Sequence, residues 1–297
     1  MQRARPLFVV NPAAGNGRAS AVIERFRGAF LGPAEVGVSA SPEDAEELAY
    51  RGAREGFAPI VAVGGDGTLQ QVANGLMRCP EPPPLGIVPA GNGNDLVRTL
   101  GLPRNPDKAI RLAWSDIAGA IDVGTCNGRC FLNVAGVGLD TKVAQAVNAR
   151  AGGSRGRLTY VVEALRELRR YENPELTLHL DDVTVVTKSL LVAIGNGRYF
   201  AGGMKVCPAA ALTDGLLDVT IGGDLSRLET LALLPTIFAG QHGRHRKVAF
   251  HRARRVRIEG PPGMAVQLDG EIVTSLPAEI GIRPGALRIV GWGSRAV

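Results

Sequence analysis

The sequence predicts a protein of two domains: an α/β domain with an open parallel sheet, followed by a largely antiparallel β-sandwich. Three observations support this fold class. The length of 297 residues suits two domains better than one. The first third of the chain repeats a short apolar run, a glycine-rich loop and a stretch with helical spacing, as in a parallel sheet covered by helices. From about Glu175 the chain becomes mostly short β segments.

In the first domain each expected strand leads through a loop into a helix. The runs expected as strands are Leu7–Val10, Val36–Val38, Ile60–Val63 and Leu85–Val88. The helices expected after them are Arg18–Leu31, a helix that Ser41 caps and Pro42 opens, a helix ending at Met77, and one after Asp95. A continuous β-branched run such as Ile60–Val63 is typical of a strand buried on both faces.

The pattern changes near residue 120, where we expect the domain boundary. We assign residues 1–123 to the α/β domain and 124–283 to the sandwich; residues 284–297, with the last strand Leu287–Val290, fit either domain. From residue 117 onward three segments are expected to be helices: Leu139–Val147, Leu158–Tyr171 and Ser226–Phe238. The segments expected to be strands are Ile117–Val123, Phe131–Val134, Leu176–Leu180, Val183–Thr187, Leu190–Ile194, Leu217–Ile221, Val248–Phe250, Arg255–Glu259, Ala265–Leu268 and Ile272–Ser275. Asp181-Asp182 is expected to form a hairpin turn.

Composition excludes several classes of protein. With 45% hydrophobic residues the chain is not a disordered one, and its 39 glycines follow no collagen repeat. No apolar stretch reaches the ~18 residues of a membrane span, so we expect a cytoplasmic protein that is at most peripheral to a membrane. Four scattered cysteines complete no zinc site. The net charge of +6 favours an anionic partner, and 5% aromatic residues give no support for nucleic acid as that partner.

Glycine-rich loops follow three of the expected strands. They span Asn11–Gly17, Gly64–Thr68 and Pro89–Asp95. In an open α/β sheet, ligands bind beyond the carboxyl ends of the strands, where glycine lets the backbone approach a phosphate and helix N-termini attract anions. A single loop of this kind would be read as a tight turn, whereas three on one sheet edge favour a phosphate site. None has the spacing of a Walker A loop.

Acidic residues add a second signal. Asp66 lies inside a loop that otherwise favours anions, so a divalent cation would have to bridge it to a phosphate. Asp122 lies at the end of an expected strand. Asp269 and Glu271 flank Gly270, and Asp214-Gly215 has a similar setting. From spacing alone, each Asp-Gly pair is also a good hairpin turn.

These motifs, taken together and in order, resemble the diacylglycerol kinase catalytic-domain family, which includes bacterial soluble lipid kinases and the sphingosine and ceramide kinases. The resemblance covers nearly the whole chain and rests on Asn11-Pro12-x-x-Gly15, Gly64-Gly65-Asp66-Gly67-Thr68, Gly91-x-Gly93-Asn94-Asp95, Asp122-Val123-Gly124, Asp214-Gly215-x-Leu217-Asp218 and Asp269-Gly270-Glu271. The Gly64–Thr68 motif is shared with NAD kinases and is similar to one in phosphofructokinases. Its combination with the Gly91–Asp95 motif and the Asp269–Glu271 motif is much more specific.

The resemblance implies a nucleotide domain like that of NAD kinases and phosphofructokinases, a β-sandwich, and an active site in the cleft between them. It implies that ATP is bound by Asn11, Pro12, Gly15, Arg18, Ser39, Gly65, Asp66, Gly67, Thr68, Gly91, Asn92, Asn94 and Asp95. Ser39 and Asn92 both stand where the family usually has threonine. The second change replaces a hydroxyl by an amide and leaves the details of nucleotide contact open.

Phosphoryl transfer depends on positioning and on neutralising charge at the γ-phosphoryl group. We expect Asp66 and Asp122 to help hold a catalytic Mg²⁺, and Asp269 to act as general base with Glu271 supporting the metal. Glu271 is an equally placed base, and the sequence does not separate the two acids. The family resemblance further implies a structural Mg²⁺, with ligands from the Asp214 side chain and the carbonyls of Ala211 and Leu216.

The sequence therefore predicts an ATP-dependent lipid kinase, a transferase of phospholipid biosynthesis that converts diacylglycerol to phosphatidic acid. The alternatives are a soluble kinase resembling NAD kinase and a non-catalytic regulator that binds nucleotide or lipid. The basic stretch His242–Arg257 would dock on an anionic membrane, or else only form the solvated faces of strands. The lipid acceptor and the existence of a homodimer are left open by the sequence.

Overall fold

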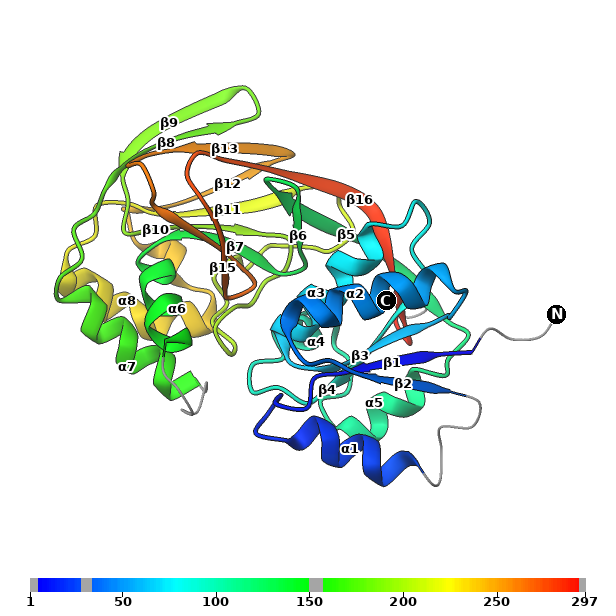
Figure 1. Ribbon diagram of the computed structural model, residues 1–297. Helices are drawn as coiled ribbons and strands as arrows, with labels where there is room; N and C mark the ends of the chain where they lie inside the picture. The colour runs from blue at the N-terminus through cyan, green and yellow to red at the C-terminus, as the bar shows by residue number, and fades with distance from the viewer. Residues whose placement is uncertain (1–4, 28–33, 150–156, 294–297) are drawn as a thin grey trace. The chain divides into compact units, whose positions relative to one another are not determined.

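The computed structural model describes residues 5–27, 34–149 and 157–293 (Figure 1). The chain divides into two compact units. Unit 1 contains the chain up to Asp122 and from Gly285 onward, and unit 2 contains Val123–Pro284. Unit 1 is an α/β unit built on parallel strands and unit 2 contains a separate antiparallel sheet, so the predicted fold class is confirmed.

Unit 1 is built on parallel strands in the order β2-β1-β3-β4, continued beyond β4 by the end of β16. Its elements are β1 Leu7–Val10, α1 Arg18–Arg27, β2 Glu35–Val38, α2 Pro42–Arg54, β3 Ile60–Gly64, α3 Asp66–Met77, β4 Leu85–Pro89, α4 Asp95–Leu100, α5 Pro106–Leu112, most of β5 Ala118–Cys126 and the last part of β16 Ala278–Val290.

Alternation along the buried strands of unit 1 distributes the helices between the two faces of the sheet. Phe8 and Val10 of β1 pack in one apolar cluster with residues of α1 and α5. Leu7 and Ile60 lie against Gly52 of α2, where an added Cβ would be 2.3 Å from a methyl group of Leu7. The strands therefore end at an edge whose loops lead into helices on both faces.

Unit 2 contains a six-stranded antiparallel sheet in the order β12-β11-β10-β7-β14-β15. A second antiparallel group has the order β16-β13-β8-β9. The elements are β6 Arg129–Phe131, β7 Val134–Gly138, α6 Leu139–Asn148, α7 Arg157–Leu168, β8 Glu175–Leu180, β9 Val183–Lys188, β10 Leu191–Gly195, β11 Leu217–Gly222, α8 Arg227–Ala239, a 3₁₀ turn η1 His242–Arg244, β12 Val248–Ala253, β13 Arg255–Glu259, β14 Ala265–Leu268 and β15 Glu271–Ser275.

One apolar core fills the space between the two strand groups of unit 2, with Phe131, Leu178, Val219, Ile258 and Leu268 among its members. A second cluster combines residues of α6, α7 and α8 with the sheet. The helices of unit 2 therefore form a layer of their own, labelled together in Figure 1.

The structure differs from the predicted elements in several places. Helix α5 Pro106–Leu112 was not predicted, the helix expected over Leu158–Tyr171 ends at Leu168, and the strand expected over Val248–Phe250 continues to Ala253. The single strand expected over Phe131–Val134 is wrong: β6 ends at Phe131, and the backbone N–H groups of the next two residues donate to the carboxylate of Asp269. The strand expected over Leu287–Val290 is the end of the longer β16. The helix expected over Arg18–Leu31 is α1 to Arg27, and its last four residues lie outside the described part of the chain.

Candidate active site

Three glycine-rich loops meet at the carboxyl ends of β1, β3 and β4, and glycine is what lets them approach. A Cβ added to Gly91 would lie 2.4 Å from the Cα of Gly65, so these two loops touch backbone to backbone. The N–H groups of Ala90 and Gly91 both donate to the carbonyl of Gly64, at 2.8 and 3.2 Å. The predicted convergence of the loops on one sheet edge is therefore present in the structure.

The first loop joins this edge through Gly15 and Arg18. Gly15 has a φ of +60°, and an added Cβ would lie 1.9 Å from the carbonyl oxygen of Ala90. The Arg18 guanidinium donates to the carbonyl of Gly15 at 2.9 Å and to the side-chain oxygen of Asn92. The amide at position 92, where the family that the sequence resembles usually has threonine, thus serves as an acceptor for Arg18.

Polar side chains fix the shape of the loops. Asn11 accepts the N–H of Ala13 at 3.0 Å and donates to the Thr68 hydroxyl at 3.2 Å, which links the first and second loops. Pro12 lies in the turn that follows Asn11. Ser39 is buried after β2, and its hydroxyl donates to the carbonyl of Val10 at 3.2 Å.

The Asp66 side chain links the second loop to the start of α4, where it acts as a capping residue. Its Oδ1 accepts the backbone N–H groups of Asp95 at 2.8 Å and Leu96 at 3.4 Å, at the start of that helix. Burial raises the pKa of the Asp66 carboxyl, although the N–H donors lower it. Gly67 follows Asp66 in the first turn of α3, so the two loops are joined by a half-buried carboxylate as well as by backbone contact.

The third loop and Asp122 complete the set of residues predicted in unit 1. Asn94 has a φ of +52° and donates to the carbonyl of Gly91 at 2.9 Å. Asp95 is buried and forms an ion pair with Arg98 at 3.6 Å. Asp122 is buried on β5, and its Oδ1 accepts the N–H of Gly285 at 2.8 Å.

In unit 2, Asp269 and Gly270 form the turn between β14 and β15. Both have positive φ, +51° and +94°, as a tight two-residue hairpin requires. The Asp269 carboxylate accepts the backbone N–H groups of Leu132, Asn133 and Val134 at 2.7, 2.9 and 3.0 Å. Glu271 is the first residue of β15 and is half-buried. The hairpin interpretation is correct, and the carboxylate also ties the turn to the start of β7.

The loop expected to bind a structural metal contains an ion pair. Asp214 accepts the N–H of Leu216 at 3.1 Å, and its other oxygen pairs with the Arg252 guanidinium. Arg252 also lies 3.6 Å from Asp218. Within residues 5–27, 34–149 and 157–293, no group of three or more His, Cys, Asp or Glu side chains is arranged to hold a metal ion.

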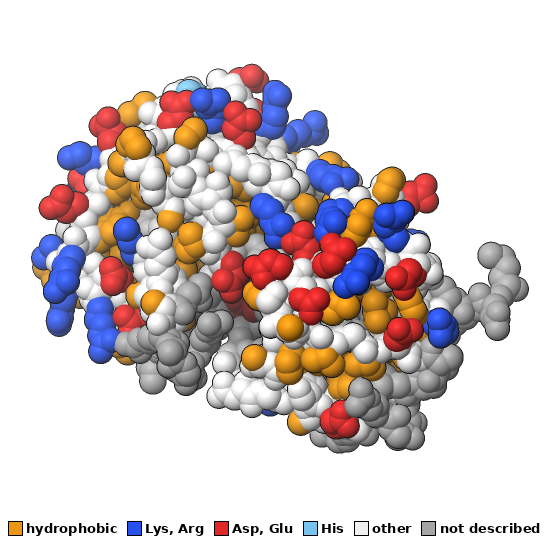
Figure 2. All heavy atoms as spheres, in the orientation of Figure 1, with side chains coloured by type: hydrophobic (Ala, Val, Ile, Leu, Met, Phe, Trp, Pro, Cys, Tyr) orange, Lys and Arg blue, Asp and Glu red, His pale blue; other side chains and the backbone are white. Residues whose placement is uncertain are grey.

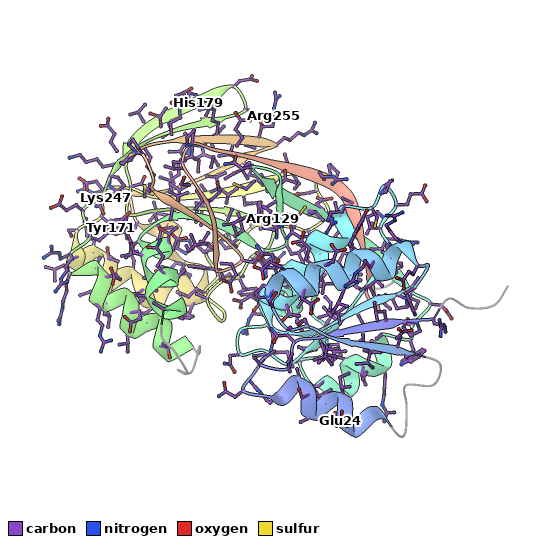
Figure 3. The ribbon with its side chains drawn as sticks, in the orientation of Figure 1. Glu24, Arg129, Tyr171, His179, Lys247 and Arg255 are labelled. Carbon is purple, nitrogen blue, oxygen red and sulfur yellow. The ribbon has the colours of Figure 1, made fainter. Side chains whose placement is uncertain are left out.

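Three of the cations in the basic stretch His242–Arg257 pair with acids of unit 2. Besides Arg252, Lys247 contacts Glu229 at 2.7 Å, and Arg257 contacts Glu259 and Glu279 at 2.9 and 3.0 Å. These pairs leave fewer unpaired cations in the stretch than the sequence alone suggests. Figure 3 shows Lys247 at the end of unit 2 that carries α7 and α8, and Arg255 near the β8–β9 hairpin.

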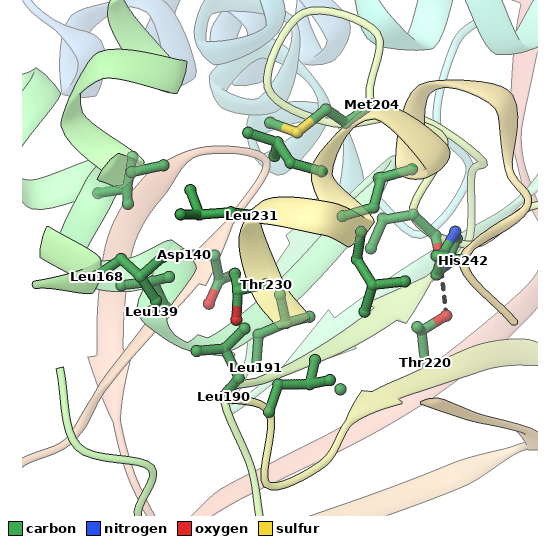
Figure 4. A pocket seen from close by; sticks show the side chains of 18 of the residues that line it. Leu139, Asp140, Leu168, Leu190, Leu191, Met204, Thr220, Thr230, Leu231 and His242 are labelled. Atoms are coloured by element: carbon green, nitrogen blue, oxygen red, sulfur yellow. Dashed lines mark hydrogen bonds between the residues drawn. The ribbon is translucent and has the colours of Figure 1, made fainter. Parts of the chain in front are cut away.

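A feature that the motifs did not indicate is an apolar cavity under the helices of unit 2 (Figure 4). Its empty space, mouth included, is about 970 Å³. It lies between α6, α7, α8 and the sheet, with Leu139, Leu168, Leu190 and Leu233 in its walls. The sequence signal that could have revealed it is the 227–239 segment, whose apolar residues fall on every side of a helix.

Asp140 is the acidic group in this cavity. One oxygen accepts the Gln267 side-chain N–H at 3.3 Å, and the other is buried with no hydrogen-bond partner in the described part of the chain. Burial raises the pKa of the carboxyl to about 7, against the lowering by Gln267. Such a group is stable as the neutral acid and offers a hydrogen bond to a polar atom in otherwise apolar surroundings.

No helix in the described residues combines the length and apolar character needed to cross a bilayer. The sequence matches the family model of the diacylglycerol kinase catalytic domain over residues 5–126. Residues 133–291 match the model of the YegS C-terminal NAD kinase beta sandwich-like domain.

Individual relatives agree with the family models. A diacylglycerol kinase from Mycobacterium tuberculosis is 35% identical over 95% of this chain and 93% of its own. A protein named "probable lipid kinase YegS-like" from Pseudomonas aeruginosa is 32% identical over 92% of this chain and 88% of its own. The crystal structure of a diacylglycerol kinase from Bacillus anthracis aligns over 100% of both chains with a TM-score of 0.75; at 22% identity this supports the fold alone. The family models and the full-length relatives together show that this chain belongs to the diacylglycerol kinase family of lipid kinases.

Proposed function

We propose that this protein transfers the γ-phosphoryl group of ATP to the free hydroxyl of diacylglycerol, which yields phosphatidic acid. The observation that carries the choice of a lipid acceptor is the apolar lining of the cavity in unit 2. An acyl chain gains ~0.8 kcal/mol for each CH₂ group removed from water. A soluble dinucleotide acceptor, as in an NAD kinase, has little surface that such a cavity would bury.

ATP binding is assigned to the loop edge of unit 1. Gly15, Gly65 and Gly91 let the three loops pack closely at this edge, and as glycines they place no side chain between the backbone and a phosphate. Arg18, whose guanidinium already spans the first and third loops, supplies a cation for phosphate oxygens. The proposal extends to Asn11, Ser39, Thr68 and the other residues predicted to bind nucleotide.

The hydrogen bonds of the Asp269 turn favour Glu271 as the general base. Asp269 holds three backbone N–H groups, so taking up a proton would weaken the bonds that position the turn. Glu271 follows two residues later, at the first position of β15. We therefore assign proton acceptance from the lipid hydroxyl to Glu271, and the positioning of its strand to Asp269.

The residues of unit 1 fit a divalent cation better than those of the Asp214 loop. Asp66 is a half-buried carboxylate with a raised pKa, and a bound Mg²⁺ would favour its charged form. The buried Asp122 is the second carboxylate proposed to hold this ion. When bound, Mg²⁺ neutralises charge on the phosphates. Asp214 already forms an ion pair with Arg252, so a metal ion at Asp214 would have to displace the guanidinium. The proposed structural Mg²⁺ can therefore bind only if Arg252 moves away from Asp214.

The function is tested by incubating the protein with labelled ATP and Mg²⁺ and a panel of diacylglycerol, monoacylglycerol, ceramide, sphingosine and phosphatidylglycerol. Label in an organic-extractable product that co-migrates with phosphatidic acid is the expected result. Label in soluble NADP, when NAD is offered instead, would identify an NAD kinase. Transfer to none of the acceptors would favour a non-catalytic binding role.

A diacylglycerol substrate also implies where the protein works, because diacylglycerol remains in the bilayer. We propose peripheral association with the cytoplasmic side of an anionic membrane, where ATP is available. The net charge of +6 supports attraction to such a surface.

A further inference from the structure

An apolar stripe faces outward along α8, a helix whose residues are all described. The exposed residues after its first position are Leu228, Leu231, Ala232, Pro235 and Ala239. Their spacing of three or four residues places them on one side of the helix. Leu228 is 79% exposed and Leu231 is 43% exposed. A surface helix ordinarily presents charged side chains on its outer face, so this stripe is unusual.

Apolar side chains are also exposed on α7, the other helix whose residues line the cavity beside α8. Val162 and Leu165 are exposed on α7, and α7 and α8 both contribute residues to the walls of the cavity. Leu165 of α7 and Leu231 of α8 are exposed to solvent and also line the cavity. We call Val162, Leu165, Leu228, Leu231 and Pro235 the apolar ridge. The ridge is therefore continuous with the walls of the cavity.

Arginines flank the ridge. Those that are exposed beside the ends of α7 and α8 are Arg169, Arg170, Arg227, Arg244 and Arg246. In Figure 2 basic side chains gather along the side of unit 2 where Figure 1 shows these helices. Glu167, Glu172 and Asp224 are acids of the same region.

Two other acids near the ridge are neutralised by bases. Glu163 is buried and pairs with Arg166 at 3.0 Å. Glu229 pairs with Lys247 at 2.7 Å and closes a capping box with Ser226 at the start of α8. The Lys247 ammonium, followed by the Ser226 donors, lowers the pKa of Glu229 to about 2, so this acid stays paired. The surroundings of the ridge thus favour an anionic surface.

We propose that the apolar ridge inserts into the interface of an anionic lipid bilayer, with the flanking arginines on the headgroups. The inference rests on the proposed lipid-kinase function for the nature of the partner. It shares Arg244 and Arg246 with the His242–Arg257 stretch, but differs from docking through that stretch alone because apolar side chains of α7 and α8 supply the main contact. A lipid surface is favoured over a protein partner because the ridge is continuous with an apolar cavity: whatever covers the ridge also meets the cavity walls. Acyl chains suit both, since leucine side chains and acyl chains are alike in polarity.

The test is a vesicle sedimentation assay with the full-length protein and no ATP or diacylglycerol. Vesicles of phosphatidylcholine with 30% phosphatidylglycerol are compared with vesicles of phosphatidylcholine alone. The variants are Leu228→Ser, Leu228→Ser with Val162→Ser, and the control Val186→Ser, which alters a 61% exposed valine on β9 of the same unit. Neither Leu228 nor Val162 lines the cavity.

The wild-type protein is expected to bind the anionic vesicles more tightly than the neutral ones. Leu228→Ser should weaken the partition coefficient about tenfold, since one leucine side chain remains in water. The double variant should weaken it further, and Val186→Ser should bind like the wild type. Phosphorylation of a short-chain, water-soluble diacylglycerol should be unchanged in Leu228→Ser.

Three results would overturn the proposal: no wild-type binding to anionic vesicles, equal binding by Leu228→Ser, or an equal loss in Val186→Ser. A change of oligomeric state in Leu228→Ser with no change in vesicle binding would assign the ridge to a second copy of the chain, and would also overturn it. Because the binding assay contains no ATP, it is independent of the kinase assay. Vesicle binding without phosphorylation of any lipid would remove the proposed function and leave the docking surface in place.

Discussion

The loop edge of unit 1 is built mainly from main-chain atoms, whereas the cavity of unit 2 is built from side chains. At the loop edge, main-chain atoms lie against main-chain atoms, as where Gly91 approaches Gly65. In the cavity, leucine and valine side chains from three helices and a sheet enclose a space. A site made of backbone tolerates no added atom, whereas a site made of flexible side chains changes gradually in volume.

The difference suits the two ligands proposed. A triphosphate is small, charged and of fixed geometry, so its donors must be held to within fractions of an ångström. An acyl chain is flexible and varies in length, so a cavity that adapts is sufficient. The Asp269 turn is the exception in unit 2, because backbone N–H groups hold its carboxylate as they hold that of Asp66.

The largest effect on activity is expected for substitutions in and next to the Asp269 turn. Glu271→Gln should lower kcat by ~10²–10⁴-fold, because it removes the proposed general base, and should leave the free energy of unfolding nearly unchanged. Asp269→Asn should lower that free energy by ~1–3 kcal/mol, because an amide cannot accept all three N–H bonds as a carboxylate does. Steady-state kinetics and urea unfolding of both variants measure the two effects. Normal turnover in Glu271→Gln with lost turnover in a stably folded Asp269→Asn would return the base to Asp269.

A matched pair of glycines tests whether backbone approach defines the loop edge. Gly15→Ala and Gly17→Ala both place a side chain at positive φ, +60° and +85°. Only the first is crowded: the new Cβ would be 1.9 Å from the Ala90 carbonyl oxygen, whereas at Gly17 no atom lies within 4 Å. Gly15→Ala should weaken ATP binding by ~100-fold, the scale on which small misplacements act, and Gly17→Ala by only a few-fold. Titration calorimetry with an ATP analogue measures both, and equal losses would assign the effect to backbone strain.

Asp140 tests the cost of a carboxyl group in the apolar cavity. Its pKa in the folded protein is raised from 3.8 to about 7, so the folded state holds its proton more tightly than the unfolded state does. The resulting stabilisation is complete below pH ~4 and is lost as the pH rises through ~7. Asp140→Asn should therefore lose ~2–3 kcal/mol less free energy of unfolding between pH 5 and pH 8 than the wild type. Urea unfolding at the two pH values measures this, with the exposed Asp182→Asn as control; identical pH dependence in wild type and Asp140→Asn would contradict it.

The smallest effect is expected for a side chain added to the cavity wall. Ala164→Phe on α7 should occupy part of the space without closing it. The KM for long-chain diacylglycerol should rise by ~10-fold, about the effect of one or two displaced methylene groups. The KM for a short-chain diacylglycerol and for ATP should stay as in the wild type. An equal rise for both chain lengths would mean that the cavity is not where the chain binds.

The loop edge was largely predictable from sequence because its determinants are local. Glycine after a buried strand indicates a close approach, and three such loops on parallel strands must meet. The bond from Arg18 to Asn92 was beyond prediction, because it depends on how two loops far apart in the chain lie against each other.

The hairpin turn at Asp269 was predictable from sequence, but the hydrogen bonds between its carboxylate and a distant segment were not. Its three N–H donors come from Leu132–Val134, more than 130 residues earlier, and they also explain why the strand expected across Phe131–Val134 is interrupted. The cavity was not predictable from motifs, since it is formed by ordinary apolar residues of separate elements. Asp140 was overlooked for the same reason, as a lone acid at the start of a helix is usually a solvated one.

The strand β16 has a consequence for how the protein is made. It begins in unit 2, where Val256 pairs with Ile280, and ends in unit 1, where Ile289 pairs with Leu85 of β4. Gly285, which bonds Asp122, lies between these points. A ribosome that has finished the first 122 residues has therefore not yet made the last strand of the sheet to which they belong. Unit 1 can reach its final form only after unit 2 and β16 have been made, and a nascent or truncated chain ending before Gly285 leaves the edge of β4 open to chaperones or to other chains.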